Sequence, residues 1–487
     1  MNTKPSKSIV KRSEGPIRPA ASLPVINPHA AGIDIGASEH YVCVPADAVS
    51  AGQSPVRRFG AFTQDLDQLV EWLRSCGVTT AAMESTGVYW VALYEKLEAG
   101  GITPVLVNAR HIRQVPGRKT DVKDCQWIQQ LHSYGLLNGS FRPGPEFCRL
   151  RTLLRYRANL TEQKCRQVQQ MQSSLQQMNV LLHHVVSDLD GETGFRIVDA
   201  ILIGERNPKA LVQLRDYRIK RSTEAEMEAA LEGRWQEEHL LILAQARKAY
   251  QFFEQQMSEC DAQIETVLKT LPSAVPSPEP ALRPPPEVAS AAPQPEASVE
   301  AGPTKKKRKR KAGGNAPKQD FLPELIRICG SDLSKVGGLN MLSILILISE
   351  LGTDMSKWRS EKAFCSWLGL APGNKISGGR VLSSRTPFVI NRIATLLRTL
   401  AINIGRTDTW LGSHHRRMRA RLGPAGAATA GARKLACVIY HLLKTKEPYL
   451  DISCLLYESK IRRHRLAKLR KQAEELGLQL VEIQKAA

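Results

Sequence analysis

Short apolar runs alternate with amphipathic stretches over residues 31–139, and this alternation is the feature that most constrains the fold. Five runs have the composition of strands: AGIDIG, HYVCVPA, VRRFGAF, TTAAMES and TPVLVNA. Helix-like periodicity begins near Asp65, Val88 and Asp121. The first three strands have no helix between them, whereas helices separate the later ones. This order predicts a mixed β-sheet with helices packed on it.

The following residues, 146–271, are rich in Leu, Gln, Glu and Arg, with apolar residues three and four positions apart. This pattern predicts two long helices that pair as an antiparallel coiled-coil arm. A helical bundle with a merely structural role is the alternative interpretation.

A segment of low complexity, residues 272–318, follows this arm. It is rich in Pro and Ala and contains the block KKKRKRK, Lys305 to Lys311. Such a composition is typical of a semi-extended linker, and seven like charges cannot fold together. The block resembles a nuclear-import signal. We expect it to contact phosphates; a solvated spacer or an added tag is the alternative.

The remaining segments complete the organisation. Residues 1–28 are polar and Pro-rich, which predicts a disordered arm, and residues 29–145 form the α/β domain. Residues 319–450 form a second, Leu/Ile-rich helical domain, and residues 451–487 a basic C-terminal helix or tail. The expected fold class is therefore α/β plus all-α.

The charge balance indicates a polyanionic partner. The 487 residues include 68 Lys+Arg against 47 Asp+Glu, a formal net charge of +21, which favours nucleic acid over an ordinary basic protein. The 10 cysteines contain no CxxC pair, which argues against a zinc ribbon or a disulfide framework and suits a reducing cytoplasm. The chain has no apolar run of about 18 residues, so we expect neither secretion nor a membrane span.

Four carboxylates stand out in the α/β domain. Asp34 interrupts the apolar first strand and Glu84 ends the fourth, whereas Asp121 and Asp124 share one face at the start of a helix. Clustered carboxylates repel one another unless a cation neutralises them, and oxygen-only ligands suit Mg²⁺ or Mn²⁺. We therefore predict that the four converge on a divalent metal. For Asp121 and Asp124 alone, helix capping is the simpler reading.

These residues resemble a known family. GIDIG, MESTG and KTDVKD are similar to the motifs of the RuvC-like, RNase H-fold DEDD domain of IS110-family insertion-sequence transposases. SKVGGLNMLSILILISELG resembles the helix-hairpin-helix-like segment of that family, and FCSWLGLAPGNKISGGR its GLxP…SG motif. The resemblance covers roughly 30–140 and 325–450, with a coiled coil between them, and it implies a serine transposase domain over 319–450.

The resemblance implies an RNA-guided DNA recombinase of a bacterial insertion sequence, cytoplasmic and associated with the nucleoid. Its partners would be donor DNA, target DNA and an element-encoded non-coding guide (bridge) RNA, with no membrane. It implies a serine-linked phosphodiester intermediate, with Mg²⁺ (or Mn²⁺) held by Asp34, Glu84, Asp121 and Asp124. Because the linker and the arm allow domains of different subunits to pair, we expect a homo-oligomer, from dimer to tetramer.

The family motif, Pro372 followed five residues on by Ser-Gly, selects Ser377 as the nucleophile. From the residues alone, GNKISGGRVLSSRT is a Gly-rich loop whose basic side chains can approach phosphates, and a plain surface loop is the alternative. Ser383 and Ser384 are rival nucleophiles. The basic side chains of this loop are Lys375, Arg380 and Arg385.

Further basic residues lie in TWLGSHHRRMRARLG and GARKLACVIYHLLK. We expect them to contact the nucleic-acid backbone, which positions a ligand without reading its sequence; a solvated charged face is the alternative. They are Arg416, Arg417, Arg419, Arg421, Arg433 and Lys434. His414 and His415 are too isolated to predict a metal site.

Two other functions compete with transposition. A RuvC-like, metal-dependent nuclease or Holliday-junction resolvase would use the same carboxylates without a covalent intermediate. A sugar-kinase or Hsp70-like ATPase would share GIDIG, but it needs a second phosphate-binding strand and a Gly-Gly adenosine motif, which the sequence lacks.

Overall fold

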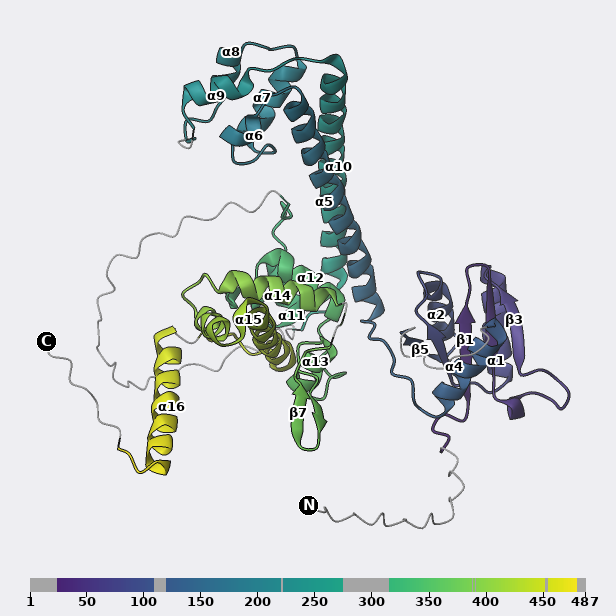
Figure 1. Ribbon diagram of the computed structural model, residues 1–487. Coiled ribbons are helices and arrows are strands. Elements are labelled where there is room, and N and C mark those ends of the chain that lie inside the picture. Colours follow the sequence, from purple (N-terminus) through teal and green to yellow (C-terminus); the bar gives the residue numbers. More distant parts are fainter. Residues whose placement is uncertain are drawn as a thin grey trace, which may run out of the picture. The chain divides into compact units, whose positions relative to one another are not determined.

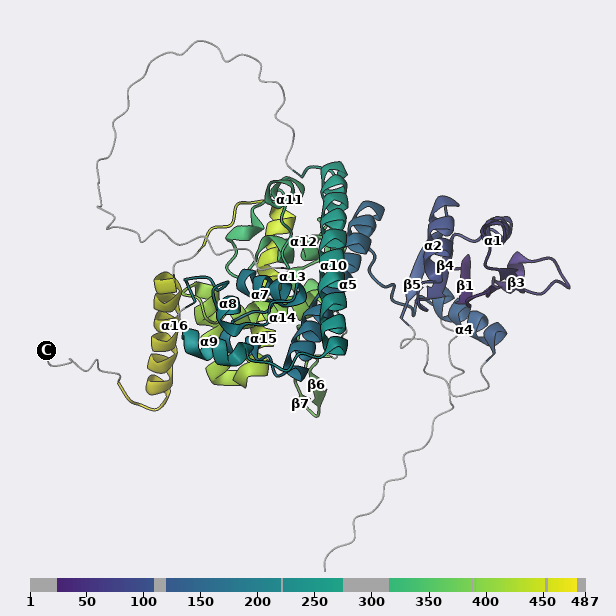
Figure 2. The same ribbon diagram turned by 90° about the horizontal axis from the view of Figure 1, so that it is seen from above.

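The computed structural model describes residues 24–108, 120–219, 222–274, 315–387, 389, 391–451 and 454–479 (Figures 1 and 2). Most of the expected N-terminal arm, most of the Pro/Ala-rich linker with its basic block, and the last residues of the tail lie outside these ranges. The chain divides into two compact units, residues 1–142 and 143–487.

The first unit contains the expected mixed sheet, with strand order β3-β2-β1-β4-β5. β1 pairs antiparallel with β2, and β2 with β3, whereas β4 is parallel to β1 and β5 to β4. All five expected strands are present: β1 (Ala30–Ile35), β2 (Glu39–Cys43), β3 (Val56–Gly60), β4 (Thr80–Glu84) and β5 (Thr103–Val107). A short 3₁₀ turn, η1 (Ala46–Ala48), follows β2.

Helices cover both faces of this sheet. α1 (Thr63–Ser75) and α2 (Trp90–Ala99) pack on one face, where Leu69 and Leu93 join Ile33 in one buried core. α4 (Asp121–Ser133) packs on the other face, where Ile128 contacts Ala82 and Val107. Successive residues of a strand face opposite sides, so Asp34 and Glu84 lie on the α4 face.

Two long helices dominate the first half of the second unit, α5 (Pro145–Gln177) and α10 (Glu237–Thr270). Thr161 lies against Met257, and the Lys164 ammonium lies 5.1 Å from the centre of the Tyr250 ring. Residue numbers thus rise along one helix as they fall along the other, so the pair is antiparallel, as expected. Its supercoiling as a coiled coil stays a prediction.

A small helical subdomain joins the far ends of these two helices (Figure 1), and the sequence interpretation did not anticipate it. Its core is apolar and includes Val180, Ile197, Leu211 and Met227. Its helices are α6 (Leu182–Val185), α7 (Glu192–Leu202), α8 (Pro208–Val212) and α9 (Glu224–Leu231).

The remainder of the second unit is mainly helical. Its elements are α11 (Leu322–Cys329), η2 (Leu333–Lys335), α12 (Met341–Leu351), α13 (Glu361–Trp367), β6 (Lys375–Ser377), β7 (Arg380–Ser383), α14 (Arg392–Ile404), α15 (Trp410–Thr445) and α16 (Cys454–Glu475). None of the helices in the described part of the chain is long and apolar enough to cross a membrane.

Two details refine the sequence interpretation of this region. The expected Gly-rich loop around Ser377 is a two-stranded antiparallel hairpin, β6–β7. α15 is not one straight helix, because Gly423 has a φ of 74° and Pro424 follows it. The two limbs fold back on each other: a Cβ at Gly431 would lie 3.3 Å from Nδ1 of His415, and the Lys434 ammonium lies 5.6 Å from the Trp410 ring.

Candidate functional site

Asp34 and Glu84 occupy matching positions on neighbouring parallel strands. The register of β1 and β4 pairs Ile33 with Met83, and each acid is the next residue of its strand. Both are half-buried, although the residues before them are fully buried. The two carboxylates therefore share the edge of the sheet where β1 and β4 end.

α4 brings its first turn to the same edge. A Cβ at Gly32 would lie 2.2 Å from the backbone nitrogen of Gln129, so only glycine allows this approach. The Gln129 amide donates to the carbonyl of Ala30 at 3.3 Å, and His132 Nε2 lies 2.9 Å from the Thr80 hydroxyl. The C-terminal end of α4 therefore lies beside the first residues of β1 and β4. Its N-terminal turn consequently lies beside the last residues of these strands.

Asp121 and Asp124 belong to that first turn. Thr120 caps the helix, and its hydroxyl accepts from the Lys123 amide at 3.3 Å. Asp121 is exposed and Asp124 is half-buried. The two acids therefore also benefit from the helix dipole, and capping and a site role coexist.

An electrostatic contact links Asp34 to this helix. The pKa of the Cys125 thiol is raised by its hydrogen bond with Cys43, by burial and by the charge of Asp34. Cys125 directly follows Asp124 in the chain. The charge of Asp34 thus affects the pKa of a residue next to Asp124, in the helix that carries Asp121 and Asp124.

The four acids suit a divalent cation in donor type. All are carboxylates, and they lie on one face at one edge of the sheet. Among the described residues, however, no three His, Cys, Asp or Glu side chains lie close enough to hold a metal ion together. The structure therefore brings the four predicted ligands to one edge without gathering them into a ligand shell.

Ser377 is the last residue of β6, at the exposed tip of the hairpin. It pairs with Arg380 across Gly378 and Gly379, whose φ values of 53° and 76° are those that a two-residue type I′ turn requires. Lys375 and Arg380 are exposed on the same hairpin. The serine thus lies at the exposed turn of a hairpin that also carries two exposed cations.

The rival serines have different surroundings. The Ser383 hydroxyl accepts from the backbone amide of Arg385 at 3.3 Å. Ser384 lines a cavity beyond the hairpin. The fold thus separates the three serines, and Ser377 alone of the three lies at the turn.

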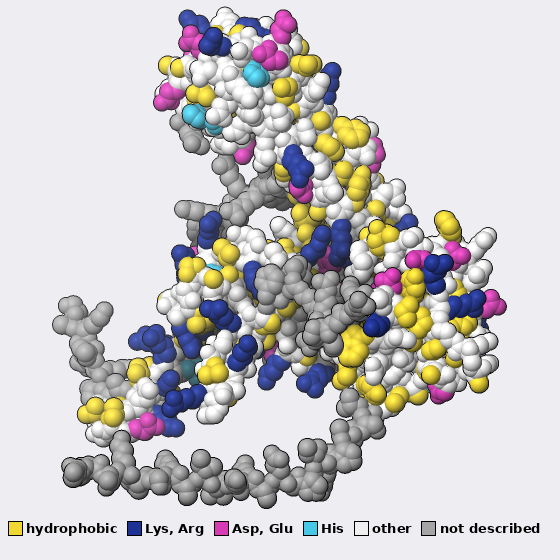
Figure 3. All heavy atoms as spheres, turned by 45° about the vertical axis from the view of Figure 1, so that its right-hand side comes forward, with side chains coloured by type: hydrophobic (Ala, Val, Ile, Leu, Met, Phe, Trp, Pro, Cys, Tyr) yellow, Lys and Arg dark blue, Asp and Glu magenta, His cyan; other side chains and the backbone are white. Residues whose placement is uncertain are grey.

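The other predicted basic contacts fall into two groups. Arg416 donates to the carbonyls of Gly405 and Thr407 at 3.2 and 2.8 Å, and Arg417 donates to the Tyr457 hydroxyl at 2.9 Å. Both therefore have structural partners. Exposed side chains form the second group: Arg385, Arg419, Arg421 and Lys434, with the half-buried Arg433 next to Lys434 in the chain. Figure 3 shows that Lys and Arg side chains gather at the lower left of the face it draws.

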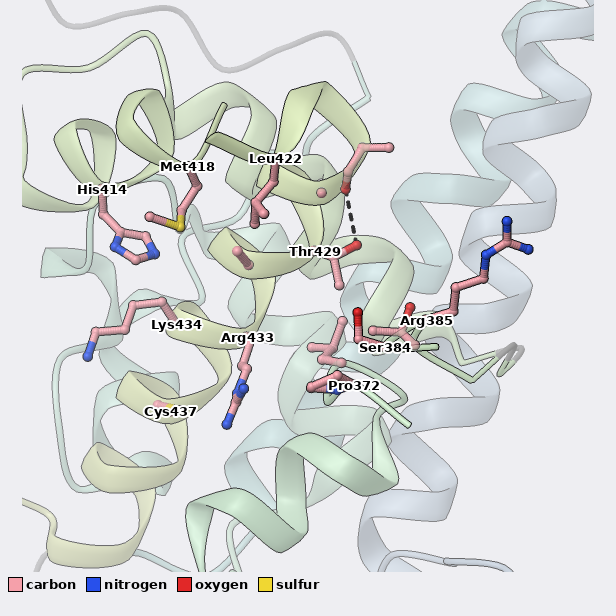
Figure 4. Close-up of a pocket in the computed structure, with 15 residues that line it drawn as sticks. Pro372, Ser384, Arg385, His414, Met418, Leu422, Thr429, Arg433, Lys434 and Cys437 are labelled. Atoms are coloured by element: carbon pink, nitrogen blue, oxygen red, sulfur yellow. Dashed lines mark hydrogen bonds between the residues drawn. The ribbon is translucent and has the colours of Figure 1, made fainter. Parts of the chain in front are cut away.

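A cavity of about 850 Å³ lies between the two limbs of α15 and the segment that follows β7 (Figure 4). His414, Met418 and Leu422 line it at intervals of four residues. Arg433 and Lys434 line it from the second limb. The sequence interpretation had set His414 aside, because periodicity does not reveal which helices face each other.

Comparisons with known proteins agree with this architecture. Residues 31–180 match the family model for a transposase named as the DEDD transposase of IS110, and this segment includes all four acids. Residues 331–416 match the model described as the transposase IS116/IS110/IS902 family, and this segment includes Ser377. No curated protein matches the chain.

Proposed function

The chain belongs to the IS110 family of transposases, and from this premise we propose that it cuts and rejoins DNA through a serine-linked intermediate, guided by RNA. Transposase activity follows from the family. The identity of the nucleophile, the use of a divalent metal and the guidance by RNA are what we propose. The observation that carries it is the placement of Asp34, Glu84, Asp121 and Asp124 on one face at one edge of the sheet.

These four acids would hold Mg²⁺ or Mn²⁺. A divalent ion, when bound, neutralises the carboxylates and polarises phosphodiester oxygens. The protein supplies the rest of this arrangement: the strand ends fix Asp34 and Glu84, and the tight packing of α4 at Gly32 fixes the other two.

Ser377 would be the nucleophile. Its hydroxyl oxygen loses its proton and forms a bond to phosphorus, one bridging P–O bond breaks, and the departing DNA oxygen takes up a proton to become a hydroxyl. The number of phosphodiester bonds is conserved, so rejoining needs no ATP. The exposed hairpin tip, flanked by Lys375 and Arg380, supports this role because a phosphate can reach it.

A guide RNA would choose the DNA sites. The net charge of +21 and the exposed basic side chains suit a backbone-binding protein, and base pairing then supplies the sequence specificity. We include in this surface the helix-hairpin-helix-like turn, residues 336–340. There the Asn340 side chain caps α12, and Gly338 has a φ of 92° and packs against Ile404. The assembly would be a dimer to tetramer.

A denaturing gel tests the covalent step. The full-length protein, purified with its RNA, is incubated with labelled DNA from the element ends and Mg²⁺. A labelled protein–DNA adduct is expected from the wild type and none from Ser377→Ala. An adduct that persists in Ser377→Ala and is lost in Ser383→Ala or Ser384→Ala would assign the nucleophile elsewhere.

The same experiment addresses the competing function. A RuvC-like nuclease or junction resolvase would cut the DNA in a Mg²⁺-dependent manner with no adduct, and the placement of all four acids within the first unit alone is the observation that keeps this alternative. Treatment with RNase tests the guide: RNA-free protein that recombined the same sites would exclude it.

A further inference from the structure

The cavity of α15 owes its shape to the break in that helix. Gly423 and Pro424 end the first limb, and the second limb returns alongside it. His414, Met418 and Leu422 face the cavity from the first limb, and Thr429 and Arg433 from the second (Figure 4). Residues after the hairpin, including Ser384 and Arg385, form the third side. These segments belong to the same unit.

The charge of this cavity is of one sign. Arg385, Arg433 and Lys434 line it, and no Asp or Glu does so among the described residues. Lys434 also borders a neighbouring pocket, whose lining includes Glu361 and Glu447. The excess of positive charge in the cavity itself favours an anionic ligand.

One side of the cavity is apolar. Met418, Leu422 and Pro372 line it, and Leu422 is 51 % exposed. Thioethers and aliphatic side chains pack well against flat aromatic rings. The volume of about 850 Å³ falls within the range of about 300–1,000 Å³ that small organic ligands occupy. The ligand should therefore carry both an anion and a flat ring.

His414 adds a directed polar group. Its Nδ1 lies 3.2 Å from the Tyr457 hydroxyl and 3.5 Å from a nitrogen of Arg417. Arginine can only donate, so Nδ1 is an acceptor. Burial and the neighbouring Arg417 and Lys434 lower the pKa of His414 to about 4, so the neutral ring carries its proton on Nε2. That N–H can donate to a carbonyl of a nucleobase.

We propose that this cavity binds one unstacked nucleotide of the DNA, with its base against Met418 and Leu422 and its phosphate against Arg433 and Lys434. The inference rests on the proposed function, since strand exchange requires bases to leave their stack. Enzymes that act on DNA accept an extruded base in this way, and the cost of unstacking is offset by contacts in the pocket.

Binding of mononucleotides to the full-length protein tests the proposal without any recombination. The probes are dTMP and dAMP, with thymidine and inorganic phosphate as the two halves of the ligand, and calorimetry measures their affinity. We expect both nucleotides to bind more tightly than either half. Phosphate that binds as tightly as dTMP would reduce the site to a general anion site and overturn the proposal.

Two variants locate the binding. Arg433→Gln removes a cation, and we expect a loss of affinity for dTMP of about 10- to 100-fold. Ala430→Phe fills the cavity without a change of charge and should abolish binding. The matched controls are Arg359→Gln and Ala420→Phe, which alter exposed residues outside the cavity. Unchanged affinity in Ala430→Phe, with a thermal unfolding midpoint like that of the wild type, would refute the site.

The proposed nucleotide pocket and the proposed serine mechanism can be refuted independently of each other. If the wild type forms the Ser377 adduct and Ala430→Phe binds dTMP normally, the pocket is wrong and the recombinase stands. If dTMP binds in the cavity and no adduct forms, the serine mechanism is wrong and the pocket stands.

Discussion

Asp34 and Glu84 lie side by side because each is the residue that follows the Ile33–Met83 pair in the register of the parallel strands β1 and β4. Two carboxylates in matching positions repel each other, so the arrangement raises the energy of the protein unless a cation is near. This pairing is what the proposed divalent-cation site would require.

Replacement of any one of these four acids by its amide should abolish DNA cleavage while DNA binding changes little. Asp34→Asn and Glu84→Gln keep the shape of the side chain and remove the charge that holds a divalent ion. Cleavage of labelled DNA in Mg²⁺, set beside a filter-binding assay, measures both properties. Asp47→Asn, an exposed acid of the same unit, is the control. Full cleavage in Asp34→Asn would remove that residue from the site.

Gly32→Ala should displace α4. The new Cβ would lie 2.2 Å from the backbone nitrogen of Gln129 and 2.4 Å from the carbonyl oxygen of Cys125, and neither backbone atom can rotate away. We expect a loss of stability of about 1–3 kcal/mol, as for other overpacked interfaces, and a marked loss of cleavage. Chemical denaturation measures the first. Gly139→Ala, where the nearest atom is 3.4 Å away, should behave like the wild type.

Gly378 offers a test of the hairpin tip. Its φ of 53° suits glycine or asparagine but not a β-branched residue. Gly378→Val should therefore distort the turn beside Ser377 and reduce adduct formation at least tenfold, whereas Gly378→Asn should keep most of it. Among the described residues nothing lies within 4 Å of a Cβ there, so the difference between the two variants should come from backbone strain alone. Equal adduct yields in the two variants would show that the turn shape does not matter.

The first unit was predictable from the sequence because its signals are local. Short runs with strand composition mark each strand, and the i, i+3 spacing of Asp121 and Asp124 puts both on one helix face. Gly32 gave no such signal, since its role depends on Gln129, which is distant in the chain. The positions of the helices and strands could therefore be predicted from the sequence, whereas the closest contacts between them could not.

The hairpin and the cavity show where sequence interpretation stops. Gly378-Gly379 is a two-residue hairpin signal, but β6 has only three residues and no buried face, so the alternation that marks a strand is absent. The cavity unites residues near 372–386 with both limbs of α15. Helical periodicity identifies a face and not the element opposite it. The choice of Ser377 as the nucleophile came from the family motif, because the composition of the loop alone does not distinguish it from Ser383 or Ser384.

The arm depends on a buried ion pair between Arg157 and Asp261. Both side chains are about 95 % buried, the guanidinium binds both carboxylate oxygens, and it also donates to the carbonyl of Asn315 at 3.0 Å. Asp261→Asn leaves a buried cation without its counter-charge and should cost about 3–5 kcal/mol. Urea denaturation measures the loss. Glu162→Gln, which removes an exposed partner of Arg166, should change stability by less than about 1 kcal/mol.

His414 should make the C-terminal region sensitive to acid. Burial, with Arg417, Lys434 and His415 nearby, lowers the pKa of His414 from 6.5 to about 4 in the folded protein. As the pH falls below 6.5, the unfolded chain takes up a proton that the folded chain refuses, so the unfolded state is favoured. The contribution of His414 to stability is intact above pH 6.5 and is lost between about pH 6.5 and 4.

Thermal unfolding between pH 7 and pH 4.5 tests this dependence. Other groups also titrate in this range, so the informative quantity is the difference between the wild type and His414→Asn, whose side chain can still accept from Tyr457. We expect the unfolding midpoint of the wild type to fall more steeply with acidification than that of the variant. His464→Asn, at an exposed histidine of α16, is the control and should follow the wild type. Parallel curves for the wild type and His414→Asn would show that the ring is protonated as easily in the folded protein as in the unfolded chain.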